Sequence, residues 1–224
     1  MDNIQRIDNI IDELKKKIGA IDQAELEEVS LTEEQLEIKS FLDERRIKYL
    51  IHFTDAENIS SIKEHGILSI EQIAKLLTDE IISSEPKVND LDRYDNELNY
   101  ISLSVSGMNQ FLYKVFRYGK QTIEHGVAIV IDASMLYKEI DTPRIYCNTN
   151  AANSEVIKGT DIESFKLLFE EVVDYGMRHF ERDAEKRCSF EPTDIQAEIL
   201  WNKCVPTKYI VCYWDLEEDF FYGN

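Results

Sequence analysis

The sequence lacks the paired cysteine and histidine motifs that build disulfide frameworks or metal sites. Its four cysteines contain no CxxC pair: Cys147, Cys188, Cys204 and Cys212. None of its four histidines has a second histidine or cysteine at metal-ligand spacing: His52, His65, His125 and His179. We therefore predict reduced, buried thiols and no metal site.

Long apolar runs are also missing. No stretch reaches the roughly 18 apolar residues that a transmembrane helix requires. The N-terminus, Met1 to Arg6, carries acidic residues early, which fits neither a signal peptide nor a transit peptide. We expect a cytoplasmic protein with no membrane partner.

Positive charge is scarce. The 25 basic residues face 44 acidic ones, for a formal net charge of -19. Such a surface argues against binding nucleic acid through a broadly basic face, so any recognition of nucleic acid must be local. The 224 residues, 43% of them hydrophobic and 10% aromatic, predict one globular domain with a short appendage.

The appendage is predicted to be helical. Residues 1–18 place six apolar side chains on one helical face: Ile4, Ile7, Ile10, Ile11, Leu14 and Ile18. A second helix is expected from Thr32, which has capping-box spacing to Gln35, toward Arg46. Residues 1–46 are thus a predicted N-terminal helical extension, whose apolar face packs on the main body or on a partner.

In residues 47–224, strand-like runs occur together with helical segments, and this pattern predicts an α+β domain. Strand-like runs rich in Ile, Val, Tyr and Leu occur at 49–53, 100–105, 127–131, 144–147, 198–201 and 209–214. Helices are expected at 56–65, 70–78, 108–117 and 161–174. Ser69 with Gln72, and Thr160 with Glu163, have capping-box spacing. Strands and helices do not alternate regularly, which argues against a doubly wound sheet.

The first candidate site follows the strand-like run that begins at Tyr49. His52 and Thr54 close this run, and Asn58 and Gly66 follow within a short amphipathic segment. Polar groups where a strand gives way to a helix are well placed to hold a ligand. Two alternatives stay open: His52 can be a core histidine bonded to backbone, and Gly66 can be only a helix C-cap.

Further polar residues lie in two other strand-like runs. Alternation places Ser102, Ser104 and Ser106 on one face, as a solvated sheet surface would also do. Glu198 lies in an apolar run, where a carboxylate is costly to bury unless it is paired or functional. Strand periodicity puts Asp194 and Gln196 on its face. The alternative is an edge-strand glutamate that faces water.

One basic and aromatic stretch interrupts the acidic chain. It contains Phe111, Tyr113, Lys114, Phe116, Arg117, Tyr118 and Lys120. Aromatic rings and cations together suit single-stranded nucleic acid, which binds by stacking and phosphate contact. A solvated amphipathic helix explains the same residues equally well.

Four blocks in this order resemble the DarT-like ADP-ribosyltransferases, toxin enzymes that modify bases of single-stranded DNA using NAD. The blocks are His52 to Ser69, Asp90 to Ser104, Tyr146 to Ala152 and Gln196 to Leu200. They span roughly residues 49–215. The resemblance implies the ADP-ribosyltransferase fold, a split mixed β-sheet around an NAD cleft, here with an N-terminal helical extension.

The resemblance also implies roles for the residues near the first block. His52 and Thr54 would contact the nicotinamide-side ribose of NAD, the co-substrate. Gly66 would hold the carboxamide through its backbone, and Asn58 and Ile67 would complete the cofactor site.

Glu198 matches the catalytic glutamate of the family. It would stabilise the oxocarbenium-like ribose and take a proton from the attacking base. Arg93, in the long polar segment 80–98, is the expected arginine of the substrate loop. Four residues are expected to bind substrate: Tyr113, Lys114, Arg117 and Asn148.

The predicted function is NAD-dependent ADP-ribosylation of a base in single-stranded DNA, with RNA as the nearest other substrate. The protein would be the toxin of a toxin–antitoxin or phage-defence system, with an antitoxin as protein partner. Two alternatives stay open: an NAD glycohydrolase, in which water replaces the base, and a non-catalytic interaction module that keeps the fold.

Overall fold

The structure is a computed structural model that describes residues 31–79, 81, 87 and 97–219. The helix predicted over residues 1–18 and the candidate Arg93 lie outside the described residues. Among the residues described, no helix is both long and apolar enough to cross a membrane.

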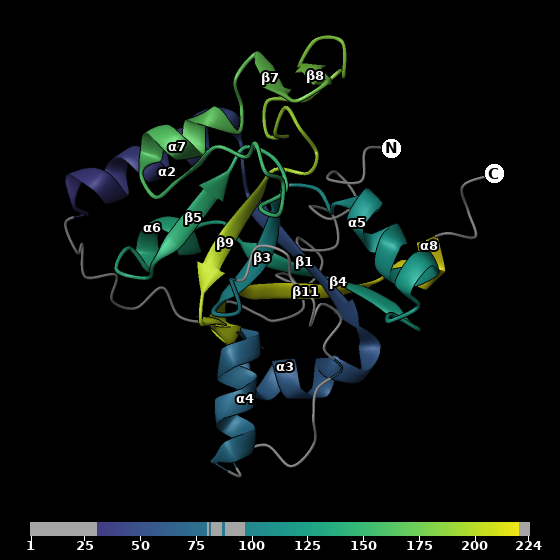
Figure 1. Ribbon diagram of the computed structural model, residues 1–224. Coiled ribbons are helices and arrows are strands. Elements are labelled where there is room, and N and C mark those ends of the chain that lie inside the picture. Colours follow the sequence, from purple (N-terminus) through teal and green to yellow (C-terminus); the bar gives the residue numbers. More distant parts are fainter. Residues whose placement is uncertain (1–30, 80, 82–86, 88–96, 220–224) are drawn as a thin grey trace.

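A seven-stranded sheet forms the centre of the molecule (Figure 1), in the order β11-β4-β1-β3-β9-β5-β6. Its strands are β1 (Tyr49–Asp55), β3 (Tyr100–Val105), β4 (Gly126–Asp132), β5 (Arg144–Cys147), β6 (Lys158–Gly159), β9 (Glu198–Asn202) and β11 (Ile210–Asp215). The predicted α+β class is confirmed. Every strand pairing described in this sheet is antiparallel, whereas a mixed sheet was expected.

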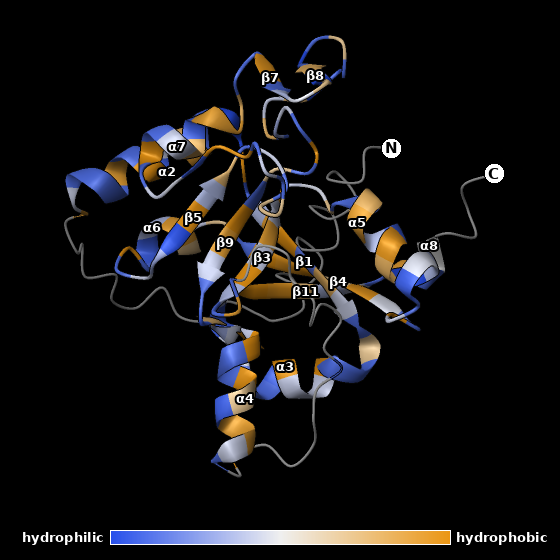
Figure 2. Ribbon diagram, in the orientation of Figure 1, coloured by the Kyte–Doolittle hydropathy of each residue, from blue (hydrophilic) through white to orange (hydrophobic). Residues whose placement is uncertain are grey.

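Both faces of this sheet are covered. Successive residues point to opposite faces, so Leu50 belongs to a large core on one side and Ile51 to a smaller core on the other. In the same way, Ile129 and Val130 of β4 enter different cores. A strand that is buried on both faces has a nearly continuous run of apolar residues in its sequence. For this reason the central strands are strongly hydrophobic in Figure 2.

Helices cover the two faces in separate groups. The larger core lies under α2 (Glu33–Arg45), α6 (Met135–Lys138) and α7 (Ile162–Leu167). The smaller core lies under α5 (Gln110–Lys114), its π-helical continuation η2 (Val115–Lys120) and α8 (Leu216–Asp219). Figure 1 shows these groups on opposite sides of the sheet.

Another group of short elements lies mainly below the sheet in Figure 1. They are η1 (Ala56–Asn58), α3 (Ile59–His65), α4 (Ile70–Thr78), η3 (Thr207–Tyr209) and the small sheet of β2 (Ile67–Leu68) with β10 (Cys204–Val205). Ser69 caps α4 by accepting a hydrogen bond from the Gln72 N–H, which confirms the predicted helix start.

Helix α2 begins where the sequence predicts. The Thr32 hydroxyl accepts from the Gln35 N–H, and the Gln35 side chain accepts from the Thr32 N–H, a complete capping box. One side of α2 is buried in the larger core through Ile38, Phe41 and Leu42. This helix therefore packs on the main body, and the domain boundary at residue 46 stays a prediction.

The predicted helix over 161–174 is wrong in its second half. Helix α7 ends at Leu167 and is capped by Asp161, not Thr160. The chain then forms a hairpin of β7 (Val172–Tyr175) and β8 (Arg178–Glu181), which projects at the top of Figure 1. The β-branched pair at the start of β7 favours a strand, and that preference outweighs the helical spacing of the apolar residues before it.

Candidate active site

A cavity of about 590 Å³ opens beside strands β1, β3 and β9. This volume lies within the usual range for pockets that hold small molecules and cofactors. Six of the predicted site residues line it: His52, Thr54, Asn58, Gly66, Ile67 and Glu198. They come from segments almost 150 residues apart in the sequence, which the β1–β3–β9 pairing brings together.

Glu198 begins β9 and is nearly buried, with 7% of its surface exposed. Both carboxylate oxygens are held: Oε1 accepts from the Ala151 N–H at 2.5 Å, and Oε2 accepts from the Ser102 hydroxyl. The edge-strand alternative is wrong, because β9 lies between β3 and β5. Two donors at a carboxylate fix its direction.

Residues just before Glu198 do not follow strand periodicity. Asp194 is fully buried and accepts from the Tyr175 hydroxyl at 2.8 Å and from the Gln196 N–H at 2.9 Å. Gln196 lines the cavity, whereas Asp194 does not. The predicted shared face is therefore wrong for Asp194, because the chain turns here before β9 begins.

His52 is oriented by the neighbouring strand. Its Nδ1 lies 3.0 Å from the Ser102 carbonyl oxygen. A carbonyl can only accept, so Nδ1 carries the proton, and in the neutral ring Nε2 is an acceptor. A neutral His52 would thus accept a hydrogen bond through Nε2.

Thr54 and Asn58 form a buried pair at the same end of the cavity. The Asn58 amide Nδ2 donates to the Thr54 hydroxyl at 2.9 Å and to the Lys87 carbonyl at 2.8 Å. The Asn58 Oδ1 accepts from the Lys87 N–H at 2.7 Å. Lys87, which sequence reasoning missed, therefore forms part of the cavity wall.

Gly66 both ends α3 and approaches another backbone closely. Its φ of 80° lies in the region that glycine favours, and an added Cβ would collide with the Val205 carbonyl oxygen on β10. The residue is a helix C-cap and also a part of the cavity lining. No side chain can replace it without moving the β2–β10 pair.

The three serines of β3 and its end are not a solvated surface. Ser104 and Ser106 are buried, and Ser102 is half-buried. Ser102 and Ser104 line the cavity, and the Ser104 hydroxyl accepts from the Asn109 N–H at 3.3 Å. The row thus supplies small polar groups beside Glu198.

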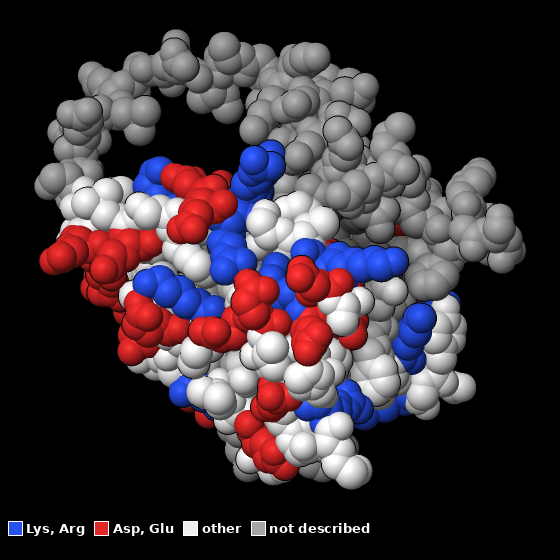
Figure 3. Space-filling model, turned by 90° about the horizontal axis from the view of Figure 1, so that it is seen from above, with Lys and Arg blue, Asp and Glu red and all other residues white. Residues whose placement is uncertain are grey.

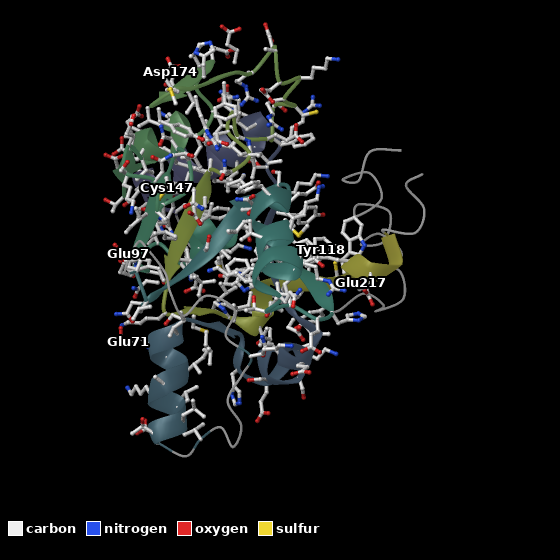
Figure 4. The ribbon with its side chains drawn as sticks, turned by 45° about the vertical axis from the view of Figure 1, so that its right-hand side comes forward. Glu71, Glu97, Tyr118, Cys147, Asp174 and Glu217 are labelled. Carbon is white, nitrogen blue, oxygen red and sulfur yellow. The ribbon has the colours of Figure 1, made fainter. Side chains whose placement is uncertain are left out.

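The basic and aromatic stretch divides between core and cavity. Tyr113 is buried in the smaller core, and this burial raises its pKa to about 12. The Arg117 guanidinium pairs with Glu217 of α8 at 3.1 Å, on the side of the molecule where Figure 4 labels Tyr118 and Glu217. Phe111 and Lys120 line the cavity instead.

None of the four predicted substrate-binding residues lies in the cavity lining: Tyr113, Lys114, Arg117 and Asn148. Asn148 closes the loop after β5, since its Oδ1 accepts from the Ile157 N–H at 2.9 Å. Thr149 and Asn150, its neighbours, reach the cavity. The loop after β5 thus holds Glu198 through Ala151 and also lines the site.

The β7–β8 hairpin supplies lining residues that sequence reasoning missed. Tyr175 and Arg178 both line the cavity from this hairpin. The helix predicted over 161–174 covered the start of β7 and ended just before these two residues, so no hairpin was expected here. The β-branched pair Val172–Val173, followed by Gly176 as a turn residue, was the available signal.

A family model described as ssDNA thymidine ADP-ribosyltransferase, DarT, matches residues 51–213. The match covers His52, Glu198 and nearly the whole described sheet. The chain belongs to the DarT family. DarT proteins are NAD-dependent ADP-ribosyltransferases, so the predicted family and enzyme class are confirmed.

Solved DarT structures resemble this member at low identity. Thermus sp. 2.9 DarT in complex with NAD+ is 16% identical, with a TM-score of 0.45 over 73% of this chain and 79% of that chain. Thermus sp. 2.9 DarT in complex with ADP-ribosylated ssDNA is 16% identical, with a TM-score of 0.45 over 74% and 79%. Thermosipho africanus DarTG in complex with ADP-ribose is 19% identical, with a TM-score of 0.43 over 73% and 42%. A comparison with curated proteins found no match. The family model therefore carries the assignment.

Proposed function

We propose that this DarT-family protein transfers ADP-ribose from NAD to a thymidine base of single-stranded DNA. The placement of Glu198 carries the proposal. Its carboxylate is held by the Ser102 hydroxyl and the Ala151 N–H at the wall of a cavity that His52 and Thr54 also line. The family description supplies the thymidine.

The chemistry needs one carboxylate in this position. The bond between the nicotinamide nitrogen and ribose C1 breaks, and nicotinamide leaves with the electron pair. Glu198 stabilises the positive charge that develops on the ribose. In a thymidine nucleoside the only ring nitrogen that bears a proton is N3, so N3 attacks C1 and its proton passes to Glu198.

The proposed cofactor residues are those of the cavity wall around β1. His52 and Thr54 hold the nicotinamide-side ribose, while the Gly66 backbone and Ile67 hold the carboxamide. The position of Gly66 and Ile67 in the cavity lining supports this role. Arg93 keeps its proposed place in the substrate loop, outside the described residues.

The substrate site proposed here differs from the one expected from sequence. The exposed ring of Phe111 and the cations Lys120 and Arg178 line the cavity, so these residues are better placed than Tyr113 and Arg117. Stacking and phosphate contact by a few residues suit an acidic protein. Seen from above in Figure 3, basic side chains lie among acidic ones and form no continuous patch, as local recognition requires.

The decisive assay uses NAD labelled in its adenylate moiety and three oligonucleotides: a single-stranded DNA, the same DNA with every thymidine replaced by cytidine, and the RNA of corresponding sequence. We expect label on the first alone, and no label with Glu198→Gln. Label on the RNA would make RNA the substrate. Nicotinamide release without transfer would favour the glycohydrolase alternative, and no turnover of NAD would contradict both enzymatic functions.

We further propose that the protein is a cytoplasmic toxin controlled by an antitoxin, in a toxin–antitoxin or phage-defence system. The family membership supports this proposal. Induced expression should arrest growth, and Glu198→Gln should not. Within the predicted extension, residues 1–46, we propose that the partner binds the part that precedes α2. Removal of residues 1–30 should therefore weaken protection by the partner without lowering the activity in vitro.

A further inference from the structure

The side chain of Asn58 uses both of its N–H groups inside the protein. One N–H donates to the Thr54 hydroxyl oxygen and the other to the Lys87 carbonyl, while Oδ1 accepts from the Lys87 N–H. Asn58 is only 7% exposed although it lines the cavity. An amide has two N–H donors, so neither is left to bind a ligand directly.

Lys87 is held at a second point by its ammonium group. Its Nζ lies 3.2 Å from Asp55 Oδ2 and 3.1 Å from Glu124 Oε1. Burial alone would raise the pKa of Asp55, but the N–H groups of Glu57 and Glu124 and the Lys87 ammonium lower it below its usual value. Asp55 therefore stays ionised near neutral pH and anchors the Lys87 side chain while Asn58 anchors its backbone.

We propose that Asn58 is a positioning residue of the NAD site, which acts through Thr54 and Lys87 and not by touching the dinucleotide. This inference rests on the proposed function. The Thr54 hydroxyl oxygen already accepts a hydrogen bond from Asn58, so its own proton is directed to an acceptor in the cavity, such as a ribose oxygen. Asn58 thus sets the direction of the Thr54 hydroxyl and the position of the wall beside it.

A double-mutant cycle separates this role from direct contact. The variants are Asn58→Ala, Thr54→Val and both together, each in the Glu198→Gln background so that NAD is not consumed. The measurement is the equilibrium Kd for NAD by calorimetry. Loss of one positioned hydrogen bond should raise the Kd about tenfold in each single variant. The double variant should bind NAD no more than about threefold more weakly than the weaker-binding single variant. The hydroxyl that Asn58 directs is already missing in Thr54→Val, so only the part of the Asn58 effect that passes through Lys87 can add to the loss.

Three results would overturn the inference. A double variant whose loss is the product of the single losses, about a hundredfold, would show that Asn58 contacts NAD independently. A Kd unchanged in Asn58→Ala, with only a lower Tm, would show a purely structural role. If neither the original protein nor Glu198→Gln binds NAD, the proposed function fails first and the inference with it. Asn58→Asp, which has a similar shape but loses both donors, repeats the test if the alanine variant does not fold, and the same non-additive result is expected.

Discussion

The two sides of the cavity are built differently. The sheet side carries Thr54 and Glu198, which are 4% and 7% exposed and are held by hydrogen bonds to neighbouring segments. The outer side, formed by α5–η2 and the β7–β8 hairpin, carries Phe111, which is 59% exposed, and Arg178. A reacting carboxylate needs a fixed direction, whereas a strand of nucleic acid needs accessible rings and cations. The difference fits the proposal that the chemistry takes place on the sheet side and that the outer side captures the substrate.

The largest effect should come from Glu198→Gln on the sheet side. We expect the rate of transfer to fall at least about a hundredfold, because an amide neither accepts the proton nor stabilises a cation as a carboxylate does. Initial rates with labelled NAD and single-stranded DNA measure this loss. Glu163→Gln on the exposed side of α7 is the control and should be fully active. Activity of Glu198→Gln within tenfold of the original would refute the sheet-side assignment.

Ser102→Ala removes one of the two donors to Glu198. A hydrogen bond to a charged group contributes about 1.5–3 kcal/mol, so kcat should fall roughly 10- to 100-fold. Steady-state kinetics should show a smaller change in the KM for DNA. Ser102→Thr keeps the hydroxyl and should recover part of the rate. Equal losses in both variants would point to altered packing in place of the hydroxyl.

On the outer side, Phe111→Ala should raise the KM for single-stranded DNA about tenfold and leave the KM for NAD unchanged. The basis is base stacking, which contributes about 1–3 kcal/mol per base. Because the ring is exposed, the Tm should hardly change. Phe111→Tyr retains an aromatic face and should behave like the original protein. A parallel rise in the KM for NAD would place Phe111 on the cofactor side.

Arg178→Gln should have a smaller effect that depends on salt. Loss of one phosphate contact should reduce the slope of log K for single-stranded DNA against log salt by about 0.7. Fluorescence anisotropy with a labelled oligonucleotide at several salt concentrations measures the slope. Lys166→Gln on α7, whose ammonium pairs with Glu163, is the matched control. An unchanged slope would remove Arg178 from the substrate path.

The smallest expected effect concerns Asp55, behind the sheet side. Its pKa is lowered in the folded state, so it stabilises the fold above its ordinary value of 3.8, and this stability is lost as the pH falls through the folded pKa. Asp55→Asn should therefore lower the Tm at neutral pH but flatten its decline at acid pH. Thermal unfolding across that range measures both. Parallel Tm profiles for the two proteins would show that Asp55 is not the titrating group.

Local patterns predicted much of the fold. The capping box of Thr32 with Gln35 and the cap of Ser69 start helices where expected, because the partners are only three residues apart. The β-hairpin at Val172–Glu181 was missed, since a helical spacing of apolar residues ran into its first strand. Short strands such as β2 and β10 were missed because they form only by pairing across more than 130 residues.

The candidate site was predicted in part. The six cavity-lining residues around His52 and Glu198 follow from motif resemblance, and their roles stay predictions. Tyr113 and Arg117 were predicted to bind nucleic acid. In the structure Tyr113 is buried in the smaller core and Arg117 forms an ion pair with Glu217. Composition identifies residue types that suit a ligand. It does not tell which of these residues are buried in the core or held in ion pairs, and so are not available to a ligand.

The sequence by itself determined the family, the α+β class and the two residues at the centre of the proposed site, because each depends on residue type and order. The tertiary structure alone decided that Ser102 and Ala151 hold Glu198, that Asn58 holds Lys87, and that Arg178 reaches the cavity. These contacts join residues 29 to 96 positions apart or bring a side chain from a separate hairpin. These contacts depend on strand register and loop closure, and no short stretch of sequence determines either one.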